Sequence, residues 1–592
     1  MVNTGNTVPL YPALDAWYPS TRLLVLLPGQ LEDSIQCDLL VVNLDDSPHY
    51  EALSYVWGGT TQKLTVTIAG KPVVVTDNLH AALYHLRYPD RDRVLWVDAL
   101  CINQSDDREK MQQVGMMGKI FQGSLHCLVW LGEISTVNDK GLRYTVQDAK
   151  AAFEMIRLIT DDEMEGDLPA SLGTSTARKG AVNALSGMMI RGNMWWQRVW
   201  TVQEAVLPAQ KIILWHTDSI PWTKCIQAAE QMVEPTERHR KVIDLLSPEL
   251  YSFDVNEFIT PFLSLELTKE EEYPLFTAHR WRYREATDPR DKVYGLLGLI
   301  NRAHVPSINC DYALSAVSVF TKFTLDLIRF DESLSPLLGW RGELHATPGL
   351  PTWALDMVRP SPLVNWGCKF WEHFDRYRFF SADGCSKLVL ATRCDESVLA
   401  LKGLIVDTVC LVDEGIAVDE RVILPNEDFA RVIERRQQLL DKFIKDFPGK
   451  AASRSDWKNA FWKTMLGDAV TLDERVTRRA TPEDADLFDQ FLKDWQWNEA
   501  AESLRSMVLN QAFFITQSGY LGIGPPHTRS GDVVCIFSGG RVPFILRSTE
   551  GDLRITSIGN SWTFIGDSFV QGIMDGELFP PSQNKIQDVL LV

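Results

Sequence analysis

The stretch that most constrains the fold of this chain runs from Tyr50 to Gly59. Its apolar and β-prone residues over Ala52–Val56 predict a short buried strand, which the two glycines that follow bring to an end. Ser54, Tyr55 and Trp57 lie at or just after the carboxyl end of that strand. Ligands of open α/β sheets bind at this edge, so the three side chains are candidates for a binding site.

Two further strands are predicted at a spacing typical of a parallel α/β sheet. Val94–Val97 is a second buried strand that ends at Asp98, and Cys127–Leu131 is a third. An amphipathic helix is expected before each of them, because apolar residues recur at helical spacing over 79–86 and 111–121. Alternating strands and helices at this spacing predict a parallel sheet.

The pattern divides the chain into three regions. We expect an α/β domain with a parallel sheet over residues 1–230, a helical middle region over 231–349, and a mixed α+β domain with inserted charged helices over 350–592. Within the first region, a loop is expected over Thr160–Gly180 and one continuous helix over Met194–Val206.

Composition excludes several classes of function. The 592 residues carry a formal net charge of −19, which argues against a sequence-independent nucleic-acid binder and against docking on anionic membranes. The ten cysteines are scattered without zinc spacing, so no metal site is expected. The polar N-terminus has no apolar signal core. These features predict a soluble, cytoplasmic protein.

Four stretches carry a resemblance to a known family. They are Tyr50–Gly58, Leu95–Gln104, Val129–Glu133 and Arg198–Glu204. In order and in spacing they resemble the fungal heterokaryon-incompatibility (HET) domain, over the first third of the chain. The stretch Asp288–Gly298 follows them as it does in long HET proteins.

The resemblance implies a role in fungal non-self recognition and regulated cell death. HET domains are thought to be distant relatives of TIR domains, several of which cleave NAD, so it also implies a TIR-like fold. TIR NADases carry a catalytic glutamate in a Trp-Cys-x-x-Glu pattern. Trp200 and Glu204 have that spacing here, with Thr201 in place of the cysteine.

Glu204 is the sharpest candidate for a catalytic group. On a continuous helix it would share one face with Trp196 and Trp200. A carboxylate among tryptophans, if buried, should have a raised pKa or a hydrogen-bonded partner. The alternative is an inward-pointing glutamate that ties the motifs together through structural hydrogen bonds.

Asp98 is the second candidate catalytic carboxylate. It could bind a ribose hydroxyl or orient Glu204, or it could accept hydrogen bonds from backbone amides in its turn. Trp57 could stack on a nucleobase or on nicotinamide, with Ser54 and Tyr55 lining the pocket. The alternative for these three residues is an aromatic core at the sheet edge.

The remaining candidates for binding a substrate are Asn103, Gln104, Arg198 and Trp200. Asn103 and Gln104 precede a helix and could donate hydrogen bonds to a phosphate, or they could tie down their loop. Arg198 could bind a phosphate or carboxylate, or it could form a salt bridge with Asp98 or Glu204.

Three functions are consistent with these residues. The first is an enzyme that cleaves the nicotinamide–ribose bond of NAD or a related nucleotide, without a cofactor or metal, with Glu204 stabilising an oxocarbenium-like state. The second is a non-catalytic signalling or scaffold module that acts by self-association or by binding a protein partner. The third is a HET fold recruited as a small-molecule enzyme of secondary metabolism.

Overall fold

The computed structural model consists of two compact units. One contains Met1–Arg302 with Asn309–Ala313, and the other contains Ala303–Ile308 with Leu314–Val592. The boundaries predicted near residues 230 and 349 fall inside these units and stay predictions. The structure describes residues 10–15, 17–30, 32–58, 63–134, 144–161, 168–189, 192–250, 256–268, 273–339, 347–358, 369–390, 397–413, 426–451, 456–472, 477–495, 498–549, 561–579 and 585–592.

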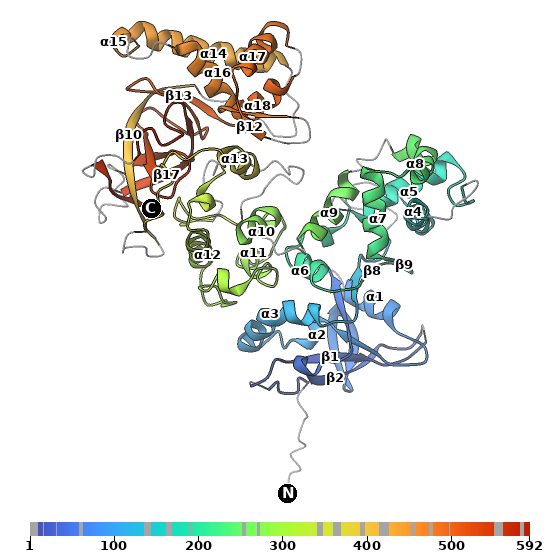
Figure 1. Cartoon of the computed structure of the whole chain (residues 1–592). Coiled ribbons are helices and arrows are strands. Elements are labelled where there is room, and N and C mark those ends of the chain that lie inside the picture. The colour runs from blue at the N-terminus through green and yellow to red at the C-terminus, as the bar shows by residue number, and fades with distance from the viewer. Residues whose placement is uncertain are drawn as a thin grey trace. The chain divides into compact units, whose positions relative to one another are not determined.

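The first unit is built on a nine-stranded sheet with the order β5-β4-β2-β1-β6-β3-β7-β8-β9 (Figure 1). Its four adjacent strands β6, β3, β7 and β8 are parallel. The pairs β1–β2, β1–β6, β4–β5 and β8–β9 are antiparallel, so the sheet is mixed. The strands are β1 Ser20–Leu26, β2 Gln36–Asn43, β3 Glu51–Tyr55, β4 Lys63–Ile68, β5 Lys71–Thr76, β6 Arg93–Trp96, β7 Cys127–Trp130, β8 Lys211–Trp215 and β9 Asp218–Pro221.

The strand predicted over Ala52–Val56 and its two predicted neighbours do lie in one sheet, which confirms the parallel core. Ala52 pairs with Trp96 of β6 on one side and with Cys127 of β7 on the other. Residues 52–55 are all buried, as expected for a strand covered on both faces. The carboxyl ends of β6, β3, β7 and β8 therefore lie along one edge of the sheet.

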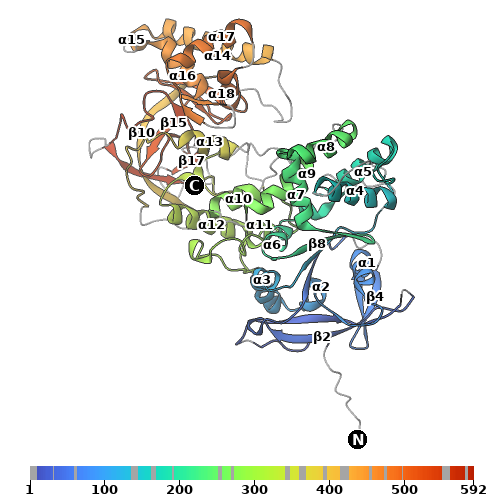
Figure 2. The same ribbon diagram turned by 45° about the vertical axis from the view of Figure 1, so that its right-hand side comes forward.

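Helices cover this sheet and extend beyond its β9 edge. Figures 1 and 2 show α1 and α3 on opposite sides of the strands. Helices α4, α5, α7, α8 and α9 pack on one another, and α4 and α7 also contact β9. The helices are η1 Leu44–Asp46, α1 Asp77–Leu86, α2 Asp98–Cys101, α3 Asp107–Gln122, α4 Val146–Ile159, α5 Ser175–Met188, η2 Met194–Gln197, α6 Trp200–Val206, α7 Trp222–Val233, α8 Glu237–Leu250, α9 Asn256–Leu267, α10 Pro274–Trp281 and α11 Asp291–Tyr294.

The prediction of one continuous helix over Met194–Val206 is wrong. The 3₁₀ turn η2 ends before Arg198, which is extended with φ −82° and ψ 134°, and α6 begins only two residues later. The break has a physical cause, because Arg198 and Glu285 form a parallel β-bridge in which the neighbouring backbone groups bond to Glu285. Trp196 is consequently not on the same helical face as Glu204.

The loop predicted over Thr160–Gly180 is wrong in its last part. Helix α5 begins at Ser175, and the side chain of Thr174 caps it by accepting a hydrogen bond from the amide of Ala177. Residues 162–167 of the predicted loop lie outside the described residues. Threonine is a favoured N-cap residue, so Thr174 is a signal for the start of a helix. The loop was predicted because the residues around Thr174 are small and polar.

The second unit contains a closed ring of five strands. Each neighbouring pair in the order β10-β15-β16-β17-β19 is hydrogen-bonded, and β19 pairs back onto β10. Strand β10 can join β19, β15 and β13 because it shifts register between Ile405 and Asp407 and again between Val409 and Leu411. Strands β15 (Val533–Phe537) and β16 (Phe544–Ser548) form an antiparallel pair within this ring.

The elements of this unit begin with helices, continue with helices and short strands between β10 and β13, and end with the consecutive strands β13 to β19. None of the helices in the described part of the whole chain is both long and apolar enough to span a membrane. The elements are η3 Arg302–His304, α12 Ala316–Asp331, η4 Ser335–Leu337, α13 Lys369–Tyr377, β10 Leu399–Asp413, α14 Asn426–Asp446, α15 Pro448–Ala451, α16 Trp457–Leu466, β11 Ala469–Thr471, β12 Thr477–Arg479, α17 Glu483–Asp494, α18 Glu499–Val508, β13 Ala512–Thr516, β14 Leu521–Gly524, β15 Val533–Phe537, β16 Phe544–Ser548, β17 Ser561–Asp567, β18 Phe569–Val570 and β19 Gln587–Leu591.

Two glycines of the first unit let separate segments touch through their backbones. A Cβ atom added at Gly118 of α3 would lie 3.0 Å from the Cα atom of Gly298, and one added at Gly298 would lie 3.2 Å from the Cα atom of Gly118. The same Cβ at Gly298 would come within 2.4 Å of the Oε1 atom of Gln203 in α6. The segment around Gly298 is therefore seated directly on α3 and α6.

We predict that Gly118→Ala lowers the free energy of unfolding by about 1–3 kcal/mol, because the new methyl group overpacks a backbone contact. Gly115 lies in the same helix with open space around it, so Gly115→Ala is the matched control. The control should be neutral or stabilising by up to about 1 kcal/mol, since alanine is the better helix former. Denaturant unfolding of both variants measures the difference, and equal effects would contradict the close approach.

Candidate functional site

A chain of three buried polar side chains joins β3 to η2 and α6. The Ser54 hydroxyl donates to the Oε2 atom of Glu204 at 2.5 Å, and the Trp195 indole donates to the Ser54 Oγ atom at 2.8 Å. Ser54 is 1% exposed and Glu204 is 5% exposed. Ser54 thus uses its hydroxyl as both donor and acceptor, and it fixes the position of the buried carboxylate.

A second carboxylate, Asp98, lies where β6 ends and α2 begins. Its Oδ2 atom accepts a hydrogen bond from the Trp57 indole at 2.7 Å, and its Oδ1 atom accepts one from the Ala99 amide at 2.7 Å. The Tyr55 phenol lies near this carboxylate and lowers its pKa. Trp57 is 40% exposed, so it forms the solvent-facing side of the group.

Arg198 acts on both carboxylates without contacting either. Its Nη1 atom donates to the backbone carbonyl of Tyr55 at 2.7 Å, and its charge lowers the pKa values of Asp98 and Glu204. Among the described residues it forms no ion pair within 4 Å. The alternative interpretation of Arg198 as a salt-bridge partner of these carboxylates is therefore wrong, and the guanidinium is held by the strand backbone.

Burial dominates the electrostatics of the site. Desolvation raises the pKa of Glu204 to about 7, against the lowering effects of the Arg198 charge and of the hydrogen bond from Ser54. The nearby Asp98 charge raises it further. Desolvation also raises the pKa of Asp98, and it raises that of Tyr55 well above its ordinary value. At neutral pH Glu204 is therefore close to its titration midpoint.

The structure brings the first-strand candidates Ser54, Tyr55 and Trp57 together with Asp98, Arg198 and Glu204. They meet at the carboxyl edge of the parallel strands, which is where the sequence places them. Their catalytic and substrate-binding roles stay predictions.

The other three candidates, Asn103, Gln104 and Trp200, lie next to the site, and their contacts are with groups other than the carboxylates of Asp98 and Glu204. The backbone amide of Asn103 donates to the Oε1 atom of Glu109 at 2.6 Å, and its side-chain Oδ1 atom accepts from the Ser105 amide at 3.2 Å. The Gln104 side chain donates to the Asp98 carbonyl at 3.0 Å. These bonds match the interpretation that both residues tie down their loop. The Trp200 indole lies near the carboxylate of Asp291 and lowers its pKa. It therefore links α6 to the segment that begins α11.

Sequence reasoning missed Trp195 and Arg284. The tandem tryptophans were visible, but only the structure shows that Trp195 is the one that reaches Ser54. Arg284 is fully buried and donates to the Thr201 hydroxyl at 3.2 Å, and its Nη2 atom has no hydrogen-bond partner among the described residues. No local pattern marks Arg284, because its partner lies 83 positions away.

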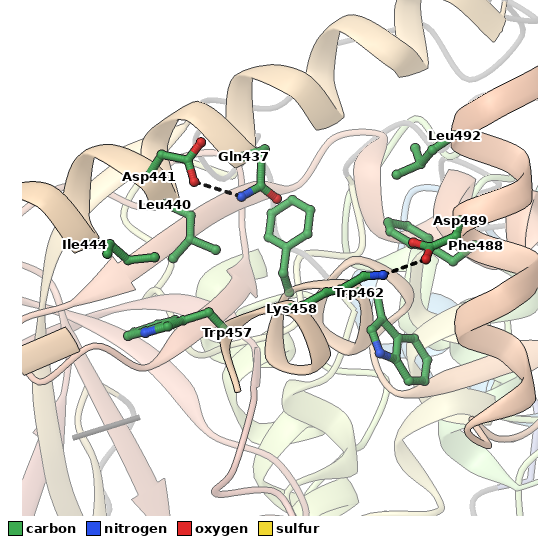
Figure 3. Close-up of a pocket in the computed structure, with 11 residues that line it drawn as sticks. Gln437, Leu440, Asp441, Ile444, Trp457, Lys458, Trp462, Phe488, Asp489 and Leu492 are labelled. Carbon is green, nitrogen blue, oxygen red and sulfur yellow. Dashed lines mark hydrogen bonds and ion pairs between the residues drawn. The ribbon is translucent and has the colours of Figure 1, made fainter. Parts of the chain in front are cut away.

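A pocket of about 280 Å³ lies in the second unit between α14, α16 and α17 (Figure 3). Its polar side chains are paired with one another: Lys458 with Asp489 at 2.7 Å, and Gln437 with Asp441 at 3.0 Å. Leucine, isoleucine and aromatic side chains line the rest. The pocket presents no free group for catalysis, so we do not place the functional site there.

Comparison with known proteins gives three findings. Residues 50–204 match the family described as heterokaryon incompatibility protein (HET), and residues 499–592 match the Het-6 beta-barrel domain. The chain is 25% identical to heterokaryon incompatibility protein 6, OR allele, of Neurospora crassa, over 98% of this chain and 97% of that protein. No solved structure matches the chain, so the TIR-like fold stays a prediction.

We predict that Glu204→Gln changes how stability depends on pH. The pKa of Glu204 rises from 4.5 to about 7 on folding, so the folded protein binds more protons than the unfolded chain in this range. The free energy of unfolding of the wild type therefore contains a term that falls as pH rises from about 4.5 to about 7. The amide lacks this term, at about 1.4 kcal/mol per pKa unit.

Between about pH 5 and about pH 8, the free energy of unfolding of the wild type should therefore fall by up to about 3 kcal/mol relative to that of Glu204→Gln. Urea denaturation at the two pH values measures it. Glu230→Gln is the control, because Glu230 is exposed on α7 and should show no such change. A pH-independent difference for Glu204→Gln would show that its carboxylate is not perturbed.

Proposed function

We propose that this chain, a heterokaryon-incompatibility (HET) domain protein, acts in fungal non-self recognition linked to regulated cell death. We also propose that its first unit cleaves the nicotinamide–ribose bond of NAD or a related nucleotide. The family supports the recognition role, and the buried carboxylate of Glu204 supports the cleavage. The observation that carries the chemistry is the placement of Glu204, with a pKa of about 7, beside Asp98 at the carboxyl edge of a parallel sheet.

The proposed reaction is the breaking of a glycosidic bond. As nicotinamide leaves with the electron pair of the bond, positive charge develops on the ribose, and a nearby carboxylate stabilises that charge. Water then adds to the ribose carbon and releases a proton, which completes the hydrolysis. Glu204 supplies the negative charge when it is ionised, and Ser54 keeps it oriented through their 2.5 Å hydrogen bond. A fixed group in a water-poor site needs little reorganisation during the reaction.

The other residues of the site would bind the nucleotide. The exposed face of Trp57 offers a surface on which a planar ring can stack. Asp98 is adjacent to that ring and could accept a hydrogen bond from a ribose hydroxyl. Arg198 contributes positive charge near both carboxylates, which suits a substrate that carries phosphates.

A specific observation favours a second function, a non-catalytic signalling or scaffold module. Glu204 is only 5% exposed and its bond to Ser54 ties α6 to β3, as a structural hydrogen bond would. In this reading the motif residues maintain the fold of a unit that works by self-association or by binding a protein partner. The two functions differ in one measurable property, which is the turnover of NAD.

We predict that the purified wild-type protein releases nicotinamide from NAD and that Glu204→Gln lowers kcat by about 100-fold or more, as expected for loss of one preorganised electrostatic group. Because catalysis needs the ionised form of Glu204, kcat/KM of the wild type should rise with pH and level off above about 7. Chromatographic detection of nicotinamide across this range measures both effects.

The control is again Glu230→Gln, which should retain the wild-type rate and pH profile. A Glu204→Gln protein that melts normally and keeps the wild-type rate would remove this residue from the mechanism. If the wild-type protein is folded, as shown by an intact melting transition, and forms oligomers but releases no nicotinamide, the result would contradict the enzyme proposal. It would support the scaffold function instead.

A further inference from the structure

A cluster of two histidines and one glutamate lies outside the carboxylate site. The Nε2 atom of His85 is 2.6 Å from the Oε1 atom of Glu133, and the Nδ1 atom of His216 contacts the Oε2 atom of the same carboxylate. The potential ligand atoms of these three residues all lie within 4.8 Å of one another. They come from the end of α1, the residues after β7 and the β8–β9 turn.

We propose that His85, Glu133 and His216 bind a divalent transition-metal ion, with Zn²⁺ as the first candidate. Two imidazole nitrogens and one carboxylate are a ligand set typical of zinc sites that keep a further position for water or substrate. Glu133 is 46% exposed in its side chain, whereas His85 is 19% and His216 is 28% exposed. An ion held by the three side chains would therefore have an open side toward solvent.

The backbone around the cluster holds the ligands close to one another. His216 has a left-handed conformation with φ 55° in the two-residue turn between β8 and β9, and Gly132 has φ 98° just before Glu133. The amide of His216 donates to the carbonyl of Gly132 at 3.1 Å, which joins the two ligand-bearing loops directly. A non-glycine residue at positive φ is uncommon, and here it directs an imidazole toward Glu133.

The third ligand is positioned by side chains behind it. The ring of Trp130 packs against His85 with centroids 5.3 Å apart. The Trp130 indole donates to the Oδ1 atom of Asn78 at 2.9 Å, and Asn78 belongs to the first turn of the same helix as His85. Helix α1 is thus fixed against the end of β7, as groups behind a metal ligand commonly fix it.

This cluster is a neighbour of the carboxylate site but shares no residue with it. Tyr55 at the end of β3 pairs with Trp130 at the end of β7, and β8 follows as the next strand of the sheet. Both sets of side chains therefore lie along the same carboxyl edge. The metal proposal does not depend on NAD cleavage, because it rests on three other residues.

In the metal-free protein Glu133 can accept hydrogen bonds from both imidazoles, so the cluster is satisfied without an ion. The test must therefore measure metal directly. We expect the EDTA-treated full-length protein, without a histidine tag, to bind one Zn²⁺ ion in isothermal titration calorimetry and to melt at a higher temperature in its presence. Binding of Co²⁺ should give a visible absorption spectrum that reports nitrogen and oxygen ligands.

Variants of the cluster should lose this binding selectively. Glu133→Gln and His216→Ala should each weaken Zn²⁺ binding by about 100-fold or more, since removing a ligand costs more than removing a group behind it. His80→Ala is the matched control, because His80 lies on α1 outside the cluster and should leave affinity unchanged.

Glu133→Gln nearly preserves the size of the side chain and its ability to accept hydrogen bonds, so it keeps the test valid if the histidine variants fail to fold. Two results would overturn the proposal. One is a folded wild-type protein that binds neither Zn²⁺ nor Co²⁺. The other is Zn²⁺ binding of wild-type affinity in Glu133→Gln, which would place the ion elsewhere in the chain.

Discussion

The hydrogen bond between Ser54 and Glu204 is the interaction on which the organisation of the first unit depends. It joins a strand at the centre of the sheet to a helix 150 positions later in the chain. Burying a carboxylate is costly unless it is hydrogen-bonded, and Glu204 meets that condition through a hydroxyl that Trp195 also fixes. The positions of β3, η2 and α6 are therefore coupled through one polar contact.

The segment beyond the family match helps to hold this contact in place. The match ends at residue 204, but the first compact unit continues to Arg302. Glu285 forms backbone hydrogen bonds with the residues between η2 and α6, Asp291 lies near Trp200, and Gly298 packs against Gln203. Helix α6 is thus held from the sheet side and from the side of the later segment, which explains why a seven-residue helix can carry a buried charge.

Much of this fold was readable from local sequence. The strand around Ala52–Val56 and its neighbours follow from apolar runs ended by glycine or aspartate, and α1 follows from the apolar residues at helical spacing over 79–86. The break at Arg198 was not readable, because its cause, Glu285, lies 87 positions away. The same limit hid Arg284 and the cluster of His85, Glu133 and His216, whose members are separated by 48 and 83 positions. Local sequence patterns, such as apolar spacing along one helix face, reveal helices, strands and their caps. Contacts between residues far apart in the sequence can be identified only once the order of the strands in the sheet is known.

The site around Asp98 and Glu204 has one buried side and one side that a ligand can reach from solvent. Glu204 is enclosed, whereas Trp57 is exposed and its indole donates one hydrogen bond, to Asp98. A hydrogen bond to a charged group contributes about 1.5–3 kcal/mol. Stacking of a base on an aromatic ring contributes about 1–3 kcal/mol, so a nucleotide that stacks on Trp57 can offset the loss of that bond. Moving the ring would also remove one of the donors that lower the pKa of Asp98. If a nucleotide binds at Trp57 as proposed, moving the ring would therefore change the charge balance next to Glu204.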